Sequence, residues 1–110
     1  MQDIWYRREK PIKLEGTLAT GVNLEMIPAP SDPTKKIHLV FGDFFTTTIE
    51  EGTLQLRDGD GGSNIGAAKF FTDQYQMFYR RMVLSPGEGL YANVGHVAGI
   101  GFEIYYWLDD

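Results

Sequence analysis

The stretch KIHLVFGDFFTTTIEEGTLQLRDGDGGSN, residues 36–64, decides the fold of this chain. From Ile37 to Gly42 the side chains alternate with a period of two residues, and both alternating sets are largely apolar. This pattern predicts a β-strand that lies well inside a sheet. The β-branched run Thr46–Ile49 suits a pleated surface, so we expect the strand to continue through it.

The second half of the stretch predicts a turn, a half-buried strand and a longer turn. Glu50-Glu51-Gly52 is the first turn. Leu54 and Leu56 then alternate with polar residues, which is typical of a strand with one face in the core. Asp58–Asn64 contains only Asp, Gly, Ser and Asn, the residues that favour turns, and it ends that strand.

The rest of the chain continues this pattern. Ile65–Phe71 is also compatible with a helical turn, and we assign it as a strand. Further strands are expected at Gln76–Leu84, Leu90–Val94 and Phe102–Leu108. Turn signals therefore recur about every ten residues, which is the spacing of a sandwich or barrel. We predict an all-β fold, an antiparallel β-sandwich of jelly-roll type in a single domain.

The N-terminal third predicts weaker structure. Short strand candidates lie at residues 4–8, 12–14, 17–20 and 22–27. Pro28, Pro30 and Pro33 then interrupt the pattern, because closely spaced prolines do not fit a central strand or a helix. We expect an N-terminal arm and a proline-rich loop over residues 1–35 and the sandwich body over residues 36–110.

Charge divides the chain unevenly. Residues 1–13 carry a net charge of +2, and the other residues carry −7, which gives the chain its total of −5. The basic segment also contains Trp5 and Tyr6, which could anchor it on a partner while Arg7 and Arg8 steer it. We predict that residues 1–13 form an attachment arm outside the sandwich core. An ordinary solvated terminus is the alternative.

Composition excludes several classes of protein. The chain has no cysteine, which excludes disulfides, thiolate metal sites and cysteine nucleophiles. The negative net charge argues against nucleic-acid binding, and no apolar run approaches the length of a membrane span. We expect a protein made in the cytoplasm that contacts neither nucleic acid nor membrane.

The candidate chemical motifs do not complete a site. Asp58–Asn64 has oxygen ligands spaced as in a calcium loop, but the glutamate that an EF-hand needs at its twelfth position is Lys69 here. A turn loop, or else a weak surface cation site, accounts for it. His38 and His96 lack partners at the spacing of a zinc site or a catalytic triad. We therefore expect no enzymatic activity, no catalytic residue, no metal and no cofactor.

Aromatic residues are the remaining signal. The chain has two tryptophans, six tyrosines and seven phenylalanines, more large rings than a sandwich of this size easily buries along with its aliphatic side chains. Tyrosine and tryptophan are enriched at interfaces. We therefore predict a homo-oligomer with an interface that draws on seven residues: Trp5, Tyr6, Arg7, Arg8, Tyr79, Tyr105 and Trp107.

Three segments resemble parts of small β-sandwich or jelly-roll proteins of bacteriophage virions, which decorate or cement heads or form parts of fibres and tails. LQLRDGDGGSNI at 54–65 is similar to their strand, Asp-Gly turn and return strand. LSPGEGLYANV at 84–94 is similar to their penultimate hairpin, and GFEIYYW at 101–107 to their closing strand. The resemblance implies a non-catalytic virion component, often trimeric, assembled in the cytoplasm of the infected host.

These observations lead to two expectations about function. The first is a capsid decoration or cement subunit that binds the major capsid protein or another virion protein. The alternative is a carbohydrate- or receptor-binding module of a tail or fibre, in which exposed tyrosine and tryptophan would stack on sugar rings. Rings buried between subunits favour the first, and rings exposed in a groove favour the second.

Overall fold

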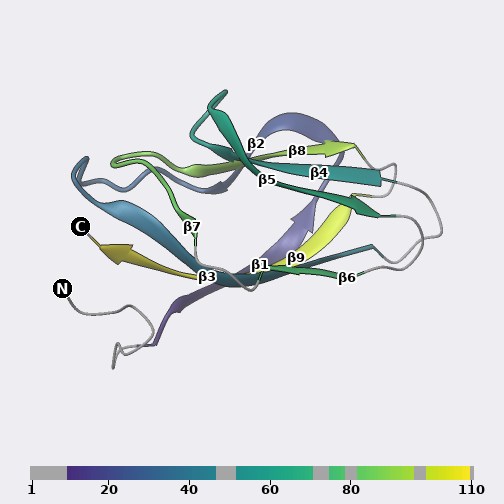
Figure 1. The fold of residues 1–110 in the computed structure, drawn as a ribbon, viewed down its shortest axis with the longest axis horizontal. Helices are drawn as coiled ribbons and strands as arrows, with labels where there is room; N and C mark the ends of the chain where they lie inside the picture. The colour runs from purple at the N-terminus through teal and green to yellow at the C-terminus, as the bar shows by residue number, and fades with distance from the viewer. Residues whose placement is uncertain (1–9, 47–51, 71–74, 79–81, 96–98, 110) are drawn as a thin grey trace.

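Two antiparallel β-sheets packed face to face make up the structure (Figure 1). The computed structural model describes residues 10–46, 52–70, 75–78, 82–95 and 99–109, and every regular element in this part of the chain is a strand. The strands are β1 (Ile12–Leu18), β2 (Gly21–Ile27), β3 (Lys36–Phe45), β4 (Gly52–Asp58), β5 (Ser63–Phe70), β6 (Tyr75–Phe78), β7 (Met82–Val83), β8 (Leu90–Gly95) and β9 (Ile100–Asp109).

The order of the strands is that of a jelly roll. Sheet A runs β1-β9-β3-β6, with β7 also paired to β3, and sheet B runs β2-β8-β4-β5. Strands from the two ends of the chain are therefore neighbours, β1 beside β9 in sheet A and β2 beside β8 in sheet B. β6 and β7 pair with successive parts of β3 and act as one interrupted strand. Two four-stranded sheets connected in this way form the eight-stranded jelly roll. The predicted all-β antiparallel sandwich is therefore confirmed.

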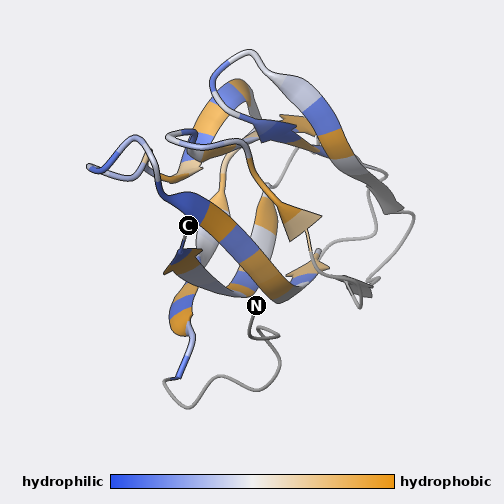
Figure 2. Cartoon of the chain, turned by 60° about the vertical axis from the view of Figure 1, so that its left-hand side comes forward, coloured by the Kyte–Doolittle hydropathy of each residue, from blue (hydrophilic) through white to orange (hydrophobic). Residues whose placement is uncertain are grey.

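The core lies between the sheets. Along β4 and β8 buried side chains alternate with more exposed ones, Figure 2 shows bands of apolar and polar residues along the strands, and the buried set faces the opposite sheet. The best buried members are Ile37, Phe44, Leu54, Leu56, Leu84, Leu90, Ala92, Ile100 and Ile104, each no more than 1% exposed. Burial of one such aliphatic side chain contributes about 2 kcal/mol, so this layer supplies most of the driving force for folding.

A β-bulge in β3 interrupts the alternation that predicted this strand. Leu39 pairs with Tyr106 and Phe41 pairs with Tyr105, so Val40 is left without a direct cross-strand partner. A bulge of this kind places one extra residue in a strand and leaves it unpaired. Leu39 faces the core, whereas Val40 belongs to a separate apolar cluster.

Among the described residues, strands of the sandwich are already present from Ile12, ahead of residue 36. β1 pairs with β9 in sheet A, and β2 pairs with β8 in sheet B. The predicted boundary at residue 36 is therefore wrong, and so is the inclusion of residues 12 and 13 in the arm. Both strands lie at sheet edges and bury few side chains, which explains their weak sequence signal. Pro28–Lys35 connects β2 to β3 as a loop.

At one end of the sandwich, hydrogen bonds join the β2–β3 loop and the β4–β5 turn to the segment between β7 and β8. The Gly59 amide donates to the Gly89 carbonyl (2.9 Å), and the Gly87 amide donates to the Lys35 carbonyl (2.8 Å). Asp58 accepts hydrogen bonds from the Ser85 amide (3.0 Å) and the Ser85 hydroxyl (2.6 Å). These bonds fasten the β4–β5 hairpin to the segment between β7 and β8.

Two of the three segments that carried the virion resemblance have the expected structure. Residues 54–65 lie in the β4–β5 hairpin, and residues 101–107 lie in β9. Residues 84–94 differ, because β7 pairs in sheet A whereas β8 pairs in sheet B. This segment therefore crosses between the sheets and is not a hairpin.

Candidate functional site

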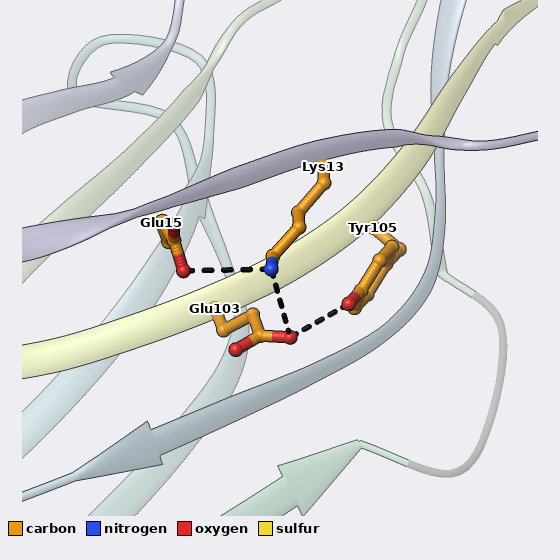
Figure 3. A network of polar contacts seen from close by, with 4 residues as sticks. All are labelled: Lys13, Glu15, Glu103 and Tyr105. Carbon is orange, nitrogen blue, oxygen red and sulfur yellow. Dashed lines mark hydrogen bonds and ion pairs between the residues drawn. The ribbon is translucent and has the colours of Figure 1, made fainter.

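The outer face of sheet A carries a cluster of charged and phenolic side chains (Figure 3). The register sets Lys13 on β1 beside Tyr105 on β9, and Glu15 beside Glu103. Lys13 Nζ lies 3.6 Å from Glu15 Oε2 and 3.8 Å from Glu103 Oε1. The Tyr105 hydroxyl donates a hydrogen bond of 2.6 Å to Glu103 Oε1. One lysine thus links two carboxylates on neighbouring strands.

The charges in this cluster alter its protonation. The carboxylates of Glu103 and Glu15 raise the pKa of Lys13, so the ammonium form is retained to higher pH. The hydrogen bond to Glu103 raises the pKa of Tyr105, with further contributions from burial and from the Glu103 charge. Both shifts favour the protonated side chain, which keeps the phenol neutral and the lysine charged around neutral pH.

Beside the charged cluster, the same face has apolar character. Trp107 is 8% exposed and Val40 is 6% exposed, and Tyr105 packs against them. His38 lies between Trp107 on β9 and Val83 on β7 in one cross-strand row. Val83 is 52% exposed, so the row ends in an accessible apolar side chain.

The outer face of sheet B is polar and its side chains are bonded to one another. Arg57 on β4 donates to Gln55 Oε1 (2.9 Å) and to the Gly62 carbonyl (3.1 Å). Asn93 on β8 donates to the same Gln55 oxygen at 3.4 Å, and Asn93 Oδ1 accepts from the Asn23 amide on β2 at 2.8 Å. The network therefore crosses three strands and holds its amide groups in fixed orientations.

Tyr91 extends this polar face toward the sheet edge. Its hydroxyl donates to Glu25 Oε2 at 3.0 Å, and this bond, together with burial and the nearby charges of Glu25, Asp60 and Glu88, raises the pKa of Tyr91. In register, Tyr91 lies between Glu25 and Arg57. The face thus presents a half-buried ring beside amide, guanidinium and carboxylate groups, a set able to hydrogen-bond a polar uncharged ligand.

The predicted interface residues fall into two groups. Trp5, Tyr6, Arg7, Arg8 and Tyr79 lie outside the described residues. Tyr105 and Trp107 are adjacent on the outer face of sheet A. Tyr105 is half-buried, but Trp107 is already 8% exposed in a single copy and has little surface left to lose on assembly.

The other candidate groups do not assemble into a reaction centre in the described part of the chain. Asp58–Asn64 forms the β4–β5 turn, in which Asp58 bonds Ser85, and no group of His, Asp and Glu suited to a metal ion occurs among the described residues. His96 and the Glu50–Glu51 pair lie outside the described residues. The described residues also contain no helix long and apolar enough to cross a membrane.

Sequence reasoning missed the two polar clusters because both depend on strand register. Lys13 was assigned to a flexible arm, and Gln55 and Arg57 were recognised only as the solvent face of a strand. The alternation marked the correct face of each strand, but it does not indicate which residue lies opposite which.

Comparison with protein families, with curated proteins and with solved structures finds no match to this chain.

Proposed function

We propose that this chain is a non-catalytic structural subunit of a bacteriophage particle, a decoration or cement protein that binds the assembled shell and self-associates on it. Jelly-roll sandwiches occur in viral capsid proteins and also in lectins, so the fold alone does not choose between these roles. The resemblance of residues 54–65 and 101–107 to virion proteins favours the first role.

The difference between the two outer faces carries this proposal. A decoration protein needs one surface for the shell and another for solvent. The outer face of sheet A combines the exposed Val83 with Tyr105 and the charged cluster around Lys13. Protein interfaces likewise combine apolar side chains with polar and charged groups. Sheet B, by contrast, presents hydrogen-bonded polar groups that suit contact with water.

Attachment is therefore assigned to the outer face of sheet A, with the major capsid protein as the expected partner. Particles of the virus that encodes the chain, purified after deletion of its gene, provide the test. We expect saturable binding of the purified chain at a fixed ratio to the capsid protein. Wild-type chain that does not bind these particles contradicts the proposal.

Two exposed valines provide a matched pair of variants for this test. Val83→Asp places a charge on the outer face of sheet A and should abolish particle binding. Val22→Asp changes a valine that is 73% exposed on β2 in sheet B, and it should bind as the wild type does. The opposite result would assign attachment to sheet B.

Recognition of a carbohydrate is a second candidate function, and the network on sheet B favours it. Gln55, Asn93 and Arg57 hold amide and guanidinium groups in fixed orientations beside the ring of Tyr91. Preorganised polar groups bind a sugar without a large ordering cost.

Screening against a glycan library tests this second function. A bound glycan should shift the amide resonances of β4 and β8, and Tyr91→Ala or Asn93→Ala should abolish binding. Thr53→Ala, an exposed residue farther along β4, is the control. A library that yields no binder contradicts this function and leaves the virion proposal unaffected.

A further inference from the structure

Among the described strands, β1 is the longest sheet-edge strand that pairs without a register shift, with seven residues against four in β6 at the other edge of sheet A. It ends the strand order of sheet A, and it pairs with β9 through seven consecutive residues without a register shift. β2, at an edge of sheet B, has two register shifts and a residue with positive φ, Asn23. β5, at the other edge, has an extra residue, Ile65, at a register shift against β4. Bulges of this kind hinder pairing with a further strand, whereas a straight edge permits it.

No strand in the described part of the chain lies on the open side of β1. An edge strand presents unpaired amide and carbonyl groups, which are satisfied either by water or by another strand. We propose that β1 pairs antiparallel with β1 of a second copy, about a twofold axis at Leu14, so that the two copies of sheet A join into one continuous sheet.

Face alternation limits the register of such a pair. Leu14 packs against the core, whereas Lys13 and Glu15 lie on the outer face of the sheet. A shift of one residue in the pairing would place core-facing side chains beside outward-facing ones. The twofold axis must therefore pass through a residue of β1 and not between two residues.

Charge then selects one residue for the axis. With the axis at Leu14, Lys13 of each copy lies opposite Glu15 of the other. With the axis at Lys13 two lysines would be opposed, and with the axis at Glu15 two glutamates would be opposed. Opposite charges across paired strands stabilise, and like charges destabilise. Both side chains are accessible, with exposures of 47% for Lys13 and 66% for Glu15.

The core-facing side of β1 is also complementary to itself in this register. Ile12, which is 45% exposed, lies opposite Gly16 of the second copy. A Cβ placed on Gly16 would be 3.4 Å from the ring of Phe102, a core residue that is 7% exposed, so only the missing side chain of the glycine separates the strand edge from that ring. The Ile12 side chain therefore meets an aromatic surface where the chain has no side chain of its own.

This pairing has twofold symmetry and builds a dimer, in which the outer face of sheet B in each copy stays free. It does not depend on the virion role or on sugar binding. It differs from the trimer implied by the virion resemblance, because an isologous edge contact closes after two copies.

Complementary charge variants test the register. Lys13→Glu alone opposes two carboxylates across the axis, and Glu15→Lys alone opposes two ammonium groups, so each single variant should be monomeric. An equimolar mixture of the two variants restores opposite charges at both positions and should form heterodimers. Light scattering should give twice the 12.4 kDa chain mass for wild type and for the mixture. Glu25→Lys, on an edge strand of sheet B, should dimerise as the wild type does.

A cysteine at the axis gives a second test that does not depend on charge. The chain contains no cysteine. In Leu14→Cys the two new thiols would lie directly opposite each other, at the Cα separation of about 4.5 to 5.5 Å that a disulfide accepts. Oxidation should yield a covalent dimer. Thr17→Cys, which lies opposite residue 11 in this register, should remain monomeric on a denaturing gel.

Wild-type chain that stays monomeric at millimolar concentration overturns the proposal, and so does a trimer. Single charge variants that dimerise like the wild type, or equal cross-linking at positions 14 and 17, would also overturn it. Circular dichroism of each variant checks that the fold is intact. If Lys13→Glu unfolds because Glu103 is near, the cysteine pair still decides the question.

Discussion

The outer face of sheet A buries apolar side chains, whereas the outer face of sheet B joins polar side chains to one another. Val40 and Trp107 are less than 10% exposed on sheet A, although they lie outside the main core. On sheet B, Gln55, Asn93 and Arg57 share hydrogen bonds and remain accessible. The outer face of sheet A therefore contributes to folding in addition to the attachment proposed for it, whereas the outer face of sheet B stays polar.

The two sheets also differ in the regularity of their central strands. β3 has a bulge after Leu39, and Val40 lies beside Trp107 on the outer side of sheet A, where the alternation with Leu39 places it. The corresponding strand of sheet B, β4, pairs with β8 in unbroken register, so its polar residues align in rows with those of β8. Unbroken rows allow side chains on adjacent strands to bond across the sheet.

The largest effect on stability is expected from a substitution that breaks the apolar cluster of sheet A. Trp107→Ala should lower the free energy of unfolding by about 3 kcal/mol, because it removes a buried indole. Urea denaturation measures this change. Tyr91→Ala removes a large ring from sheet B and should have a much smaller effect. Equal losses in the two variants would show that the two faces do not differ in their contribution to folding.

The next largest effect on stability is expected from the hydrogen bonds that fasten the β4–β5 hairpin to the segment between β7 and β8. Asp58→Ala removes the acceptor of the Ser85 amide and hydroxyl, and we expect a loss of about 1 to 2 kcal/mol. Ser85→Ala removes only the hydroxyl bond and should cost less. Fluorescence of the tryptophans and circular dichroism should still report a single unfolding transition. Separate transitions would mean that the two sheets unfold independently.

A smaller loss is expected from the polar network of sheet B. Arg57→Ala removes the bonds to Gln55 and to the Gly62 carbonyl, which should lower stability by about 1 kcal/mol. Arg57→Lys should recover little of it, because an ammonium lacks the forked geometry of a guanidinium. Thermal unfolding of both variants measures the difference. Full recovery by lysine would show that charge alone matters at this position.

The smallest effects concern the two bonded tyrosines, one on each face. The pKa of Tyr105 is raised above its ordinary value of 10.0 by its bond to Glu103, and that of Tyr91 by its bond to Glu25. A raised pKa in the folded state stabilises the protein below pH 10, and this contribution is lost as the pH rises through the raised value.

Selective substitutions separate these two titrations. Glu103→Gln should lower the pKa of Tyr105 and leave that of Tyr91 raised, and Glu25→Gln should do the reverse. The ultraviolet absorbance of tyrosinate follows both titrations. Tyr105→Phe and Tyr91→Phe each remove one phenol and so show which titration belongs to which tyrosine. A glutamine variant with an unchanged titration curve would contradict the bond assigned to that glutamate.

Sequence alone predicted the strands whose two faces differ clearly in polarity. β4 and β9 alternate clearly, turn residues follow β4, and the β4–β5 hairpin and β9 form as expected. β1 and β2 were underestimated because a sheet edge buries few of their side chains. The position of the bulge at Val40 depends on how β3 packs between β9 and β7, which periodicity does not contain.

The candidate sites were less predictable than the fold. Tyr105 and Trp107 share the outer face of sheet A, but the burial of Trp107 depends on Val40, a residue far away in the sequence. The Arg57–Gln55–Asn93 network and the Lys13–Glu103 contact both require the register between strands that are distant along the chain. A single sequence without structure does not provide that register.

Gly61 gives the protein a practical use as a scaffold. It sits at the tip of the β4–β5 turn, and a Cβ built on it would meet no atom within 4 Å. In contrast, a Cβ on Gly89 would lie 2.5 Å from the Ile27 carbonyl oxygen, inside the bonded end of the sandwich. A foreign peptide inserted after Gly61 would therefore be displayed in solvent without displacing a neighbour, and the same insertion at Gly89 would disrupt the connections between the sheets.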